Sequence, residues 1–384
     1  MDFGLNDEQQ LLQETARRFV DDVCPPERAR DWDEAHHYPQ ELFDGFADLG
    51  WLELAFDDPD GGPRIGGATE LTIITEALGR ASLDVAQCFC LTLQAGLLLQ
   101  DFAPDAMRAD LLPKLRAGTK RLSMAISEPD AGSDAASMRT FAADHGDHFV
   151  LDGQKMWCTG AGLPNTMIVC YVRTDRDAPK HQGLSVVLLD PTAPGVELRK
   201  IPTLARHIMG TYEVYLDGVE VPKDHLIGEL NDGWHVLLAG LSFERALISG
   251  GYIGAAQATV DEALEYAKTR HAFGRPIGEF QALTHGLADI QTEVDAARLL
   301  VYRAAWLLDQ GLDAGREGSM AKLKGSETYV AAARLGMQIC AGHGFSTESV
   351  MSFRYRESIV APISGGTSQI QRNAIARSMG LRGY

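Results

Sequence analysis

Apolar residues recur at intervals of three and four along the first third of the chain, which is the spacing of amphipathic helices. Two such runs are Leu11, Leu12, Ala16, Phe19 and Val20, and then Leu71, Ile74, Ala77 and Leu78. Asn6 followed by Gln9 is typical of a capping arrangement at a helix start. We therefore expect an N-terminal α-helical domain over residues 1–122.

Short apolar runs replace the helical pattern between about Ser123 and Leu230. Residues 149–151 and 155–157 flank Asp152-Gly153, a pair that is typical of a hairpin turn. Asp217-Gly218 is expected to turn the chain in the same way after the run at 213–216. This pattern predicts a central β domain over residues 123–230, built as a small barrel or a sandwich.

Long helical patterns return after about Asp232. Apolar stripes with many alanines run through Leu237–Lys268, Leu283–Gln310 and Met320–Ala341. The third domain is therefore expected to be helical and to cover residues 231–384. The fold class is α+β, with a helical, a β and a helical domain in that order.

Composition narrows the choice of function. The chain has 384 residues, with 35 Lys and Arg against 53 Asp and Glu, a formal charge of −18. Nucleic acid and anionic membranes are poor partners for so acidic a chain, and no apolar stretch approaches the length of a membrane span. Six scattered cysteines and a start without signal-peptide features predict a cytoplasmic protein. No metal site is expected.

Four segments carry residues suited to a cofactor, although each also has a purely structural interpretation. Residues 125–134 are small and hydroxylated, but such a run is also a common surface turn. Trp157 and Thr159 share one strand face, but a core Trp is also common. The cations at 270–275 could bind a diphosphate or simply complement a helix C-terminus. The glycine-containing segments 338–345 and 364–371 are weak signals when each is taken alone.

In this order and over nearly the whole chain, the segments resemble the acyl-CoA dehydrogenase family of flavoproteins. The resemblance implies FAD, a central β-barrel domain, a C-terminal four-helix bundle and a homotetramer built as a dimer of dimers. It implies that Ile126, Ser127, Trp157 and Thr159 surround the isoalloxazine and that Ser133 contacts flavin and acyl-CoA. The remaining implied FAD contacts, some of them to a neighbouring subunit's cofactor, are Arg270, Phe273, Phe280, Gln281, Gln338, Gly342, Thr367 and Gln369. Ala341 replaces the first glycine of the family's usual pair.

The resemblance also locates a catalytic base. Many family members carry a Glu at the position of Gly365, which has no side chain. Isovaleryl-CoA and long-chain acyl-CoA dehydrogenases instead carry it at the position of Glu244, next to Arg245. We therefore expect Glu244 to remove the α-proton, Arg245 to order the thioester end and Gly365 to bind the thioester through its N–H. The alternative is that Glu244 and Arg245 form an exposed helix ion pair.

The resemblance leaves the substrate open. A short or branched acyl-CoA is expected, with electron-transferring flavoprotein as acceptor and fatty acid metabolism as the context. Acyl or aminoacyl groups on carrier proteins are the second possibility, and the Ser-Gly-Gly sequence also resembles the crotonobetainyl-CoA reductases. Ser242 stands where several relatives have Asp, so the CoA contacts transfer less securely. An oxidase that passes electrons to O₂ and a non-catalytic thioester-binding scaffold stay open as well.

Overall fold

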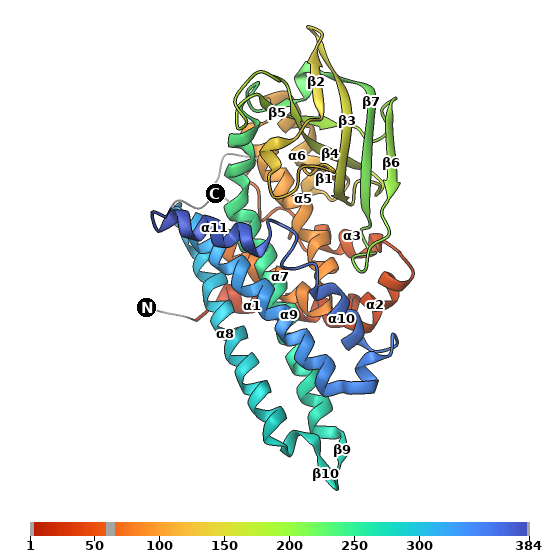
Figure 1. Cartoon of the computed structure of the whole chain (residues 1–384), viewed down its shortest axis with the longest axis vertical. Coiled ribbons are helices and arrows are strands. Elements are labelled where there is room, and N and C mark those ends of the chain that lie inside the picture. Colours follow the sequence, from red (N-terminus) through yellow and green to blue (C-terminus); the bar gives the residue numbers. More distant parts are fainter. Residues whose placement is uncertain (1–3, 59–65, 382–384) are drawn as a thin grey trace.

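The computed structural model describes residues 4–58 and 66–381 of the chain. Within these ranges six helices come first, an eight-stranded sheet follows, and further helices come last (Figure 1). The N-terminal helices are α1 (Asp7–Val23), α2 (Pro26–Glu34), α3 (Gln40–Asp48), α4 (Ala68–Ala81), α5 (Leu83–Phe102) and α6 (Asp105–Arg116). The predicted cap is confirmed, because Asn6 Oδ1 accepts from Gln9 N and Gln9 Oε1 accepts from Asn6 N.

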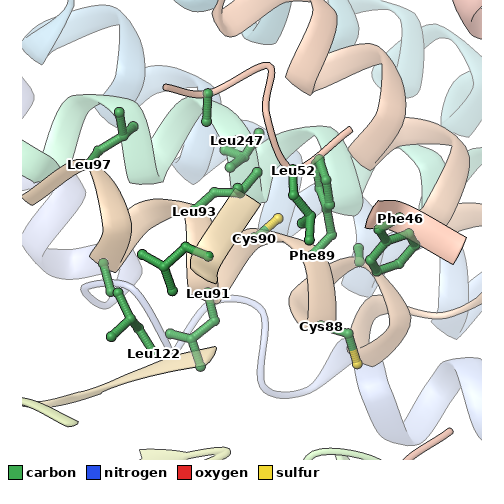
Figure 2. Packing of buried hydrophobic residues seen from close by; sticks show 14 of the residues in the cluster. Phe46, Leu52, Cys88, Phe89, Cys90, Leu91, Leu93, Leu97, Leu122 and Leu247 are labelled. Atoms are coloured by element: carbon green, nitrogen blue, oxygen red, sulfur yellow. The ribbon is translucent and has the colours of Figure 1, made fainter. Parts of the chain in front are cut away.

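Helix α5 is the centre of the largest apolar core. Its residues from Leu83 to Leu99 are all buried. In Figure 2, Leu91 and Leu93 of this helix lie between Leu122, from the first strand, and Leu247, from the long helix after the sheet. Because α5 is covered on all sides, it fixes the positions of the helices and the sheet that surround it.

Two helices are long and apolar enough to cross a membrane by composition alone, namely α5 and α7 (Gly233–Thr269). Within their most apolar windows, 94% of the residues of α5 and 61% of those of α7 are buried inside the protein. A helix that already has protein on most of its surface cannot present that surface to lipid, so both are accounted for as core helices.

The sheet is mixed and does not close into the predicted barrel. Its strands are β1 (Arg121–Ala125), β2 (Phe141–Asp144), β3 (His148–Thr159), β4 (Thr166–Arg173), β5 (Leu184–Leu189), β6 (Val196–Lys200), β7 (Thr211–Pro222) and β8 (Leu226–Ile227). They follow the order β6-β7-β3-β2-β4-β5-β8, with β1 parallel to β4. Strands β6 and β8 remain edges in the described part of the chain.

The predicted turns at the two Asp-Gly pairs are wrong. Asp152-Gly153 lies inside β3 and Asp217-Gly218 inside β7, where the pairing of the two strands shifts register. Gly153 has φ +148° and Gly218 φ +61°, conformations that favour glycine in bulges as well as in turns. Asp152 Oδ1 accepts from Gly218 N at 2.9 Å and joins the two irregular points.

The C-terminal domain contains three long helices and two short ones rather than four comparable helices. The long helices are α7, α8 (Gln281–Asp309) and α9 (Gly315–Phe345), and the short ones are α10 (Val350–Ser358) and α11 (Ser368–Ser378). Helix α4 of the first domain packs along α7, and a side chain at Gly254 would collide with the Glu76 carbonyl. The first and third domains therefore share one helical core.

Candidate active site

The site near the sheet is built around an irregular point in β3. Trp157 has φ +62° and lies where the register with β7 breaks, and its side chain is 56% exposed. A bulge with such a backbone re-aims a side chain out of the regular pleat. Met156 N donates to Ser127 O at 2.8 Å, which joins β3 to the loop after β1. The structure thus brings Ile126, Ser127, Trp157 and Thr159 together, with Ser133 exposed farther along that loop.

A buried ion pair, which the sequence analysis missed, holds this loop in place. Lys155 Nζ lies 2.7 Å from Glu128 Oε1, and both side chains are buried. Glu128 also accepts from Arg139 N and Thr140 N, and Lys155 donates to Ile126 O. Burial alone would raise the pKa of the Glu128 carboxyl, but Lys155 and these hydrogen bonds lower it overall. The sequence did contain a signal for this ion pair. A Lys on the buried face of a strand needs a negatively charged partner, because an unpaired buried charge is costly.

Glu244 and Gly365 meet in space although 121 residues separate their numbers. A Cβ atom built on Gly365 would lie 3.4 Å from Glu244 Oε1 and 3.9 Å from Lys322 Cε. Gly365 has φ +62°, and the carbonyls of Gly365 and Gly366 both accept from Gln371 Nε2. The carboxylate on α7 therefore fills the space that a side chain at position 365 would enter.

The positive charges of Arg245 and Lys322 affect the pKa of the Glu244 carboxyl without forming an ion pair with it. Within residues 4–58 and 66–381, no ion pair within 4.0 Å joins either cation to Glu244. Arg245 turns to α9 and donates to Ser319 Oγ at 3.0 Å, so the two residues do not form an exposed helix pair. Burial raises the pKa of the Glu244 carboxyl, and the charges of Arg245 and Lys322 offset part of that rise.

Lys322 is the second residue that the sequence analysis missed. Its side chain is fully buried, and Nζ donates to Ala361 O at 2.9 Å. Burial lowers its pKa to about 8, against the opposing influence of Glu244. The signal in the sequence was a Lys within the apolar stripe of a helix, a position that is usually given to a hydrophobic residue.

Another group of predicted residues lies at the opposite end of the molecule. Helix α7 ends at the β9–β10 hairpin (His271–Ala272 and Arg275–Pro276), far from the sheet in Figure 1. Phe273 at its tip is 96% exposed, and its ring lies 6.1 Å from that of Phe280. The end of α9 is joined to this region by the stacked rings of Tyr266 and His343. The residues placed here are Arg270, Phe273, Phe280, Gln281, Gln338 and Gly342.

Thr367 and Gln369 lie instead near Gly365, at the start of α11. Thr367 caps the helix by accepting from Ile370 N. With Ile363 and residues of α9, both line a surface pocket of about 520 Å³. Each chain therefore carries two separate groups of predicted residues, one near Glu244 and the sheet and one at the hairpin end.

A larger pocket, of about 1,750 Å³, lies between α1, α4 and α8 and contains none of the predicted residues. Part of its polar lining is already paired, since Glu76 accepts from both Arg298 and Tyr302. Elsewhere in the described ranges, no group of three or more His, Cys, Asp or Glu is placed to hold a metal ion.

Comparison with known families covers almost the whole chain. The acyl-CoA dehydrogenase N-terminal domain matches residues 6–119, the middle domain residues 123–219 and the C-terminal domain residues 231–380. Glutaryl-CoA dehydrogenase of Desulfococcus multivorans is 33% identical over 98% of this chain and 97% of its own. The caffeyl-CoA reductase–Etf complex subunit CarC of Acetobacterium woodii is also 33% identical, over 97% and 98%.

Solved structures agree over the same length. A glutaryl-coenzyme A dehydrogenase bound to glutaryl-CoA is 32% identical, with a TM-score of 0.94 over 100% of this chain and 98% of its own. PigA with FAD and proline is 29% identical, with a TM-score of 0.93 over 100% of both chains. PigA has also been solved as a complex with FAD alone, and FAD is the cofactor of this chain.

The residues present fit a flavin. The exposed ring of Trp157 offers a flat apolar surface. Thr159 lies two residues farther along the same strand, and its carbonyl accepts from Ser123 Oγ at 2.7 Å. At the start of α11, Gln371 Oε1 is buried without a hydrogen-bond partner among the described residues. Unsatisfied polar atoms next to open backbone are what a polar ligand leaves behind in a protein-only structure. The chain therefore belongs to the acyl-CoA dehydrogenase family of FAD-dependent oxidoreductases.

Proposed function

We propose that this protein catalyses the α,β-dehydrogenation of an acyl thioester, with Glu244 as the base. The observation that carries the proposal is the 3.4 Å between Glu244 Oε1 and a Cβ built at Gly365. The two positions at which family members carry the base, those of Glu244 and Gly365, therefore lie next to each other in the fold. A carboxylate near a pKa of about 4 is a weak base, and burial makes Glu244 stronger.

In this proposal the loop around Gly365 prepares the thioester for proton loss. Gln371 Nε2 holds the carbonyls of Gly365 and Gly366. The Gly365 N–H is then directed at the thioester oxygen, where a donor stabilises the charge that develops as the α-proton leaves. Arg245 and Lys322 keep the neighbourhood of Glu244 positive. Bound FAD supplies the acceptor for the β-hydride, at flavin N5.

We further propose that FAD is bound between two copies of the chain. Ile126, Ser127, Ser133, Trp157 and Thr159 would hold the isoalloxazine end, together with Thr367 and Gln369. The hairpin-end residues Arg270, Phe273, Phe280, Gln281, Gln338 and Gly342 would hold the pyrophosphate and adenine end of a neighbour's cofactor. The separation of the two groups within one chain supports this arrangement (Figure 1), as does the homotetramer implied by the family.

The proposed substrate is a short or branched acyl-CoA, converted in the cytoplasm with electron-transferring flavoprotein as acceptor. The relatives named for glutaryl-CoA and for a caffeyl-CoA reductase–Etf complex support a CoA thioester and that acceptor. A carrier-protein thioester is the second candidate, which the PigA structure with proline supports. A partly buried carboxyl with a raised pKa, beside a glycine loop, argues against a non-catalytic scaffold.

The test is anaerobic titration of the purified holoenzyme with acyl-CoA and carrier-protein thioesters, followed by flavin absorbance. Wild type should bleach with one class, and Glu244→Gln should keep its FAD but reduce at least 10³-fold more slowly. Glu265→Gln, an exposed change on the same helix, is the matched control and should behave as wild type. Normal reduction of Glu244→Gln would falsify the assignment of the base.

Moving the base provides an independent check. Glu244→Gly combined with Gly365→Glu should recover part of the lost rate, because the new carboxylate would start from the same point in space. Recovery should be incomplete, since a non-glycine residue at φ +62° is strained. A double variant that is folded, contains FAD and is as slow as Glu244→Gly alone would contradict the convergence of the two positions.

A further inference from the structure

Two buried amides lie on the face of α5 that packs on α7. Gln87 Oε1 and Gln94 Nε2 are fully buried, and neither has a hydrogen-bond partner among the described residues. Each of the two side chains is only 7% exposed. They lie seven residues apart, and therefore on one face of the helix. A buried amide without a partner costs free energy, so two on one face call for an explanation.

Helix register places Gln94 opposite the proposed base. A side chain at Gly240 of α7 would lie 3.1 Å from Leu98 Cδ2, and one at Gly251 would lie 3.2 Å from Ala86 Cβ. The two helices are therefore antiparallel. Because the helices are antiparallel, a step of four residues forward along α7, from Gly240 to Glu244, matches a step of four residues backward along α5, from Leu98 to Gln94. The Gln94 amide and the Glu244 carboxylate are therefore at the same height in the interface between the two helices.

The sheet adds a third polar group to this space. Tyr171 of β4 is fully buried, and its hydroxyl has no partner in the described ranges. It belongs to the same core cluster as Leu98 of α5 and Leu247 of α7. Figure 2 shows part of this cluster, with Leu247 labelled. Burial and then the Glu244 carboxylate raise the pKa of the Tyr171 phenol, so the two groups are within electrostatic range. Helices α5 and α7 and strand β4, which meet in this core cluster, thus each carry one of these polar side chains.

We propose that this region selects an acyl group that carries an uncharged hydrogen-bonding atom beyond its β-carbon, with Gln94 as the residue that recognises it. The inference rests on the proposed function, because it takes the space between α5, α7 and β4 as the acyl pocket. A plain alkyl chain would leave the amide and the phenol unsatisfied. A distal carboxylate would lose its hydration on entering this core, and a neutral amide and phenol would not replace that hydration with an opposite charge.

Binding to an inactive holoenzyme tests this without turnover. The protein is Glu244→Gln with FAD bound, and the probes are pantetheine thioesters, because CoA and carrier proteins share that arm. Hexanoyl and 4-methoxybutyryl thioesters have nearly the same shape but differ by one ether oxygen, and glutaryl adds a charge. The dissociation constants are measured by calorimetry or by perturbation of the flavin spectrum.

We expect the methoxy probe to bind about tenfold or more tightly than hexanoyl, because only the ether oxygen satisfies the Gln94 amide. Adding Gln94→Leu should abolish or invert that ratio. Adding Gln100→Leu, the same change on another face of α5 where Gln100 accepts from Asp57 N, should leave the ratio as it was. FAD content and melting temperature identify any variant that has failed to fold.

Three results would overturn the inference: hexanoyl binding as tightly as the methoxy probe, glutaryl binding more tightly than both, or equal effects of the two Leu substitutions. Failure of all three probes to bind would also count against it. Flavin reduction by wild type is recorded separately. If wild type reduces its flavin but binding shows no preference for the ether oxygen, the role of Gln94 is wrong and the proposed dehydrogenation stands. If binding is selective but no thioester reduces the flavin, the role of Gln94 stands and the proposed dehydrogenation is wrong.

Discussion

At the scale of single residues, the ionisation of Glu244 is set by burial and by two nearby cations. Burial raises the pKa of its carboxyl, and Arg245 and then Lys322 work against that rise. Only the ionised carboxylate can accept the α-proton, so flavin reduction should slow as the pH falls through this raised pKa. Glu244 thus gains basicity from its apolar surroundings and keeps its charge through its neighbours.

Replacing Lys322 by Met removes one of these cations while nearly preserving volume. The pKa of Glu244 should then rise further, so the acidic limb of the rate profile should move to higher pH by about one unit. Lys324→Met is the control, because Lys324 pairs with Glu293 on the outside of the same helix. The measurement is the rate of anaerobic flavin reduction against pH. A lower rate at every pH, without a shift of the limb, would show that Lys322 serves only packing.

At the scale of elements, periodicity predicted the helices because their contacts are local. The predicted runs Leu237–Lys268 and Leu283–Gln310 match α7 and α8 closely. The Asp-Gly pairs failed because a glycine at positive φ suits a bulge as well as a turn. The pairing of β3 with β7 decides between the two, and that pairing is non-local.

The departure at Ala341 could be noticed in the sequence, but its strain could not. Helix α9 is interrupted there, and Ala341 has φ 49° and ψ −128°, a conformation suited to glycine. Ala341→Gly should therefore raise the melting temperature by about 2 °C, whereas Ala331→Gly, in the regular exposed part of the same helix, should lower it. Differential scanning calorimetry of the holoenzyme measures both. Equal destabilisation by the two changes would mean that position 341 is not strained.

At the scale of the whole molecule, the two groups of cofactor residues lie at opposite ends of one chain. In Figure 1 the sheet lies at the top, the β9–β10 hairpin at the bottom and α11 between them. Arg270 and Phe273 belong to the hairpin end, and we propose that they bind the cofactor end that lies away from the flavin ring. A single sequence does not indicate how far apart the two groups lie. The number of residues between them gives a distance in space only once the direction of the long helix that connects them is known. If each site is assembled from two copies, defects at the two ends should complement one another.

The decisive experiment co-expresses Glu244→Gln with the double variant Arg270→Ala, Phe273→Ala. Alone, the first should bind FAD without reducing it, and the second should lose most of its FAD. In a mixed dimer, one site would combine both defects while the other would combine an intact Glu244 with an intact hairpin. Random pairing makes half of the dimers mixed, so roughly a quarter of all sites should recover wild-type reduction. Purification through two different tags removes the tetramers that contain one variant alone and should raise that share only slightly, to roughly two sevenths. If each chain instead binds FAD with its own residues, neither preparation can exceed the activity of the separate variants, because no copy carries both intact ends.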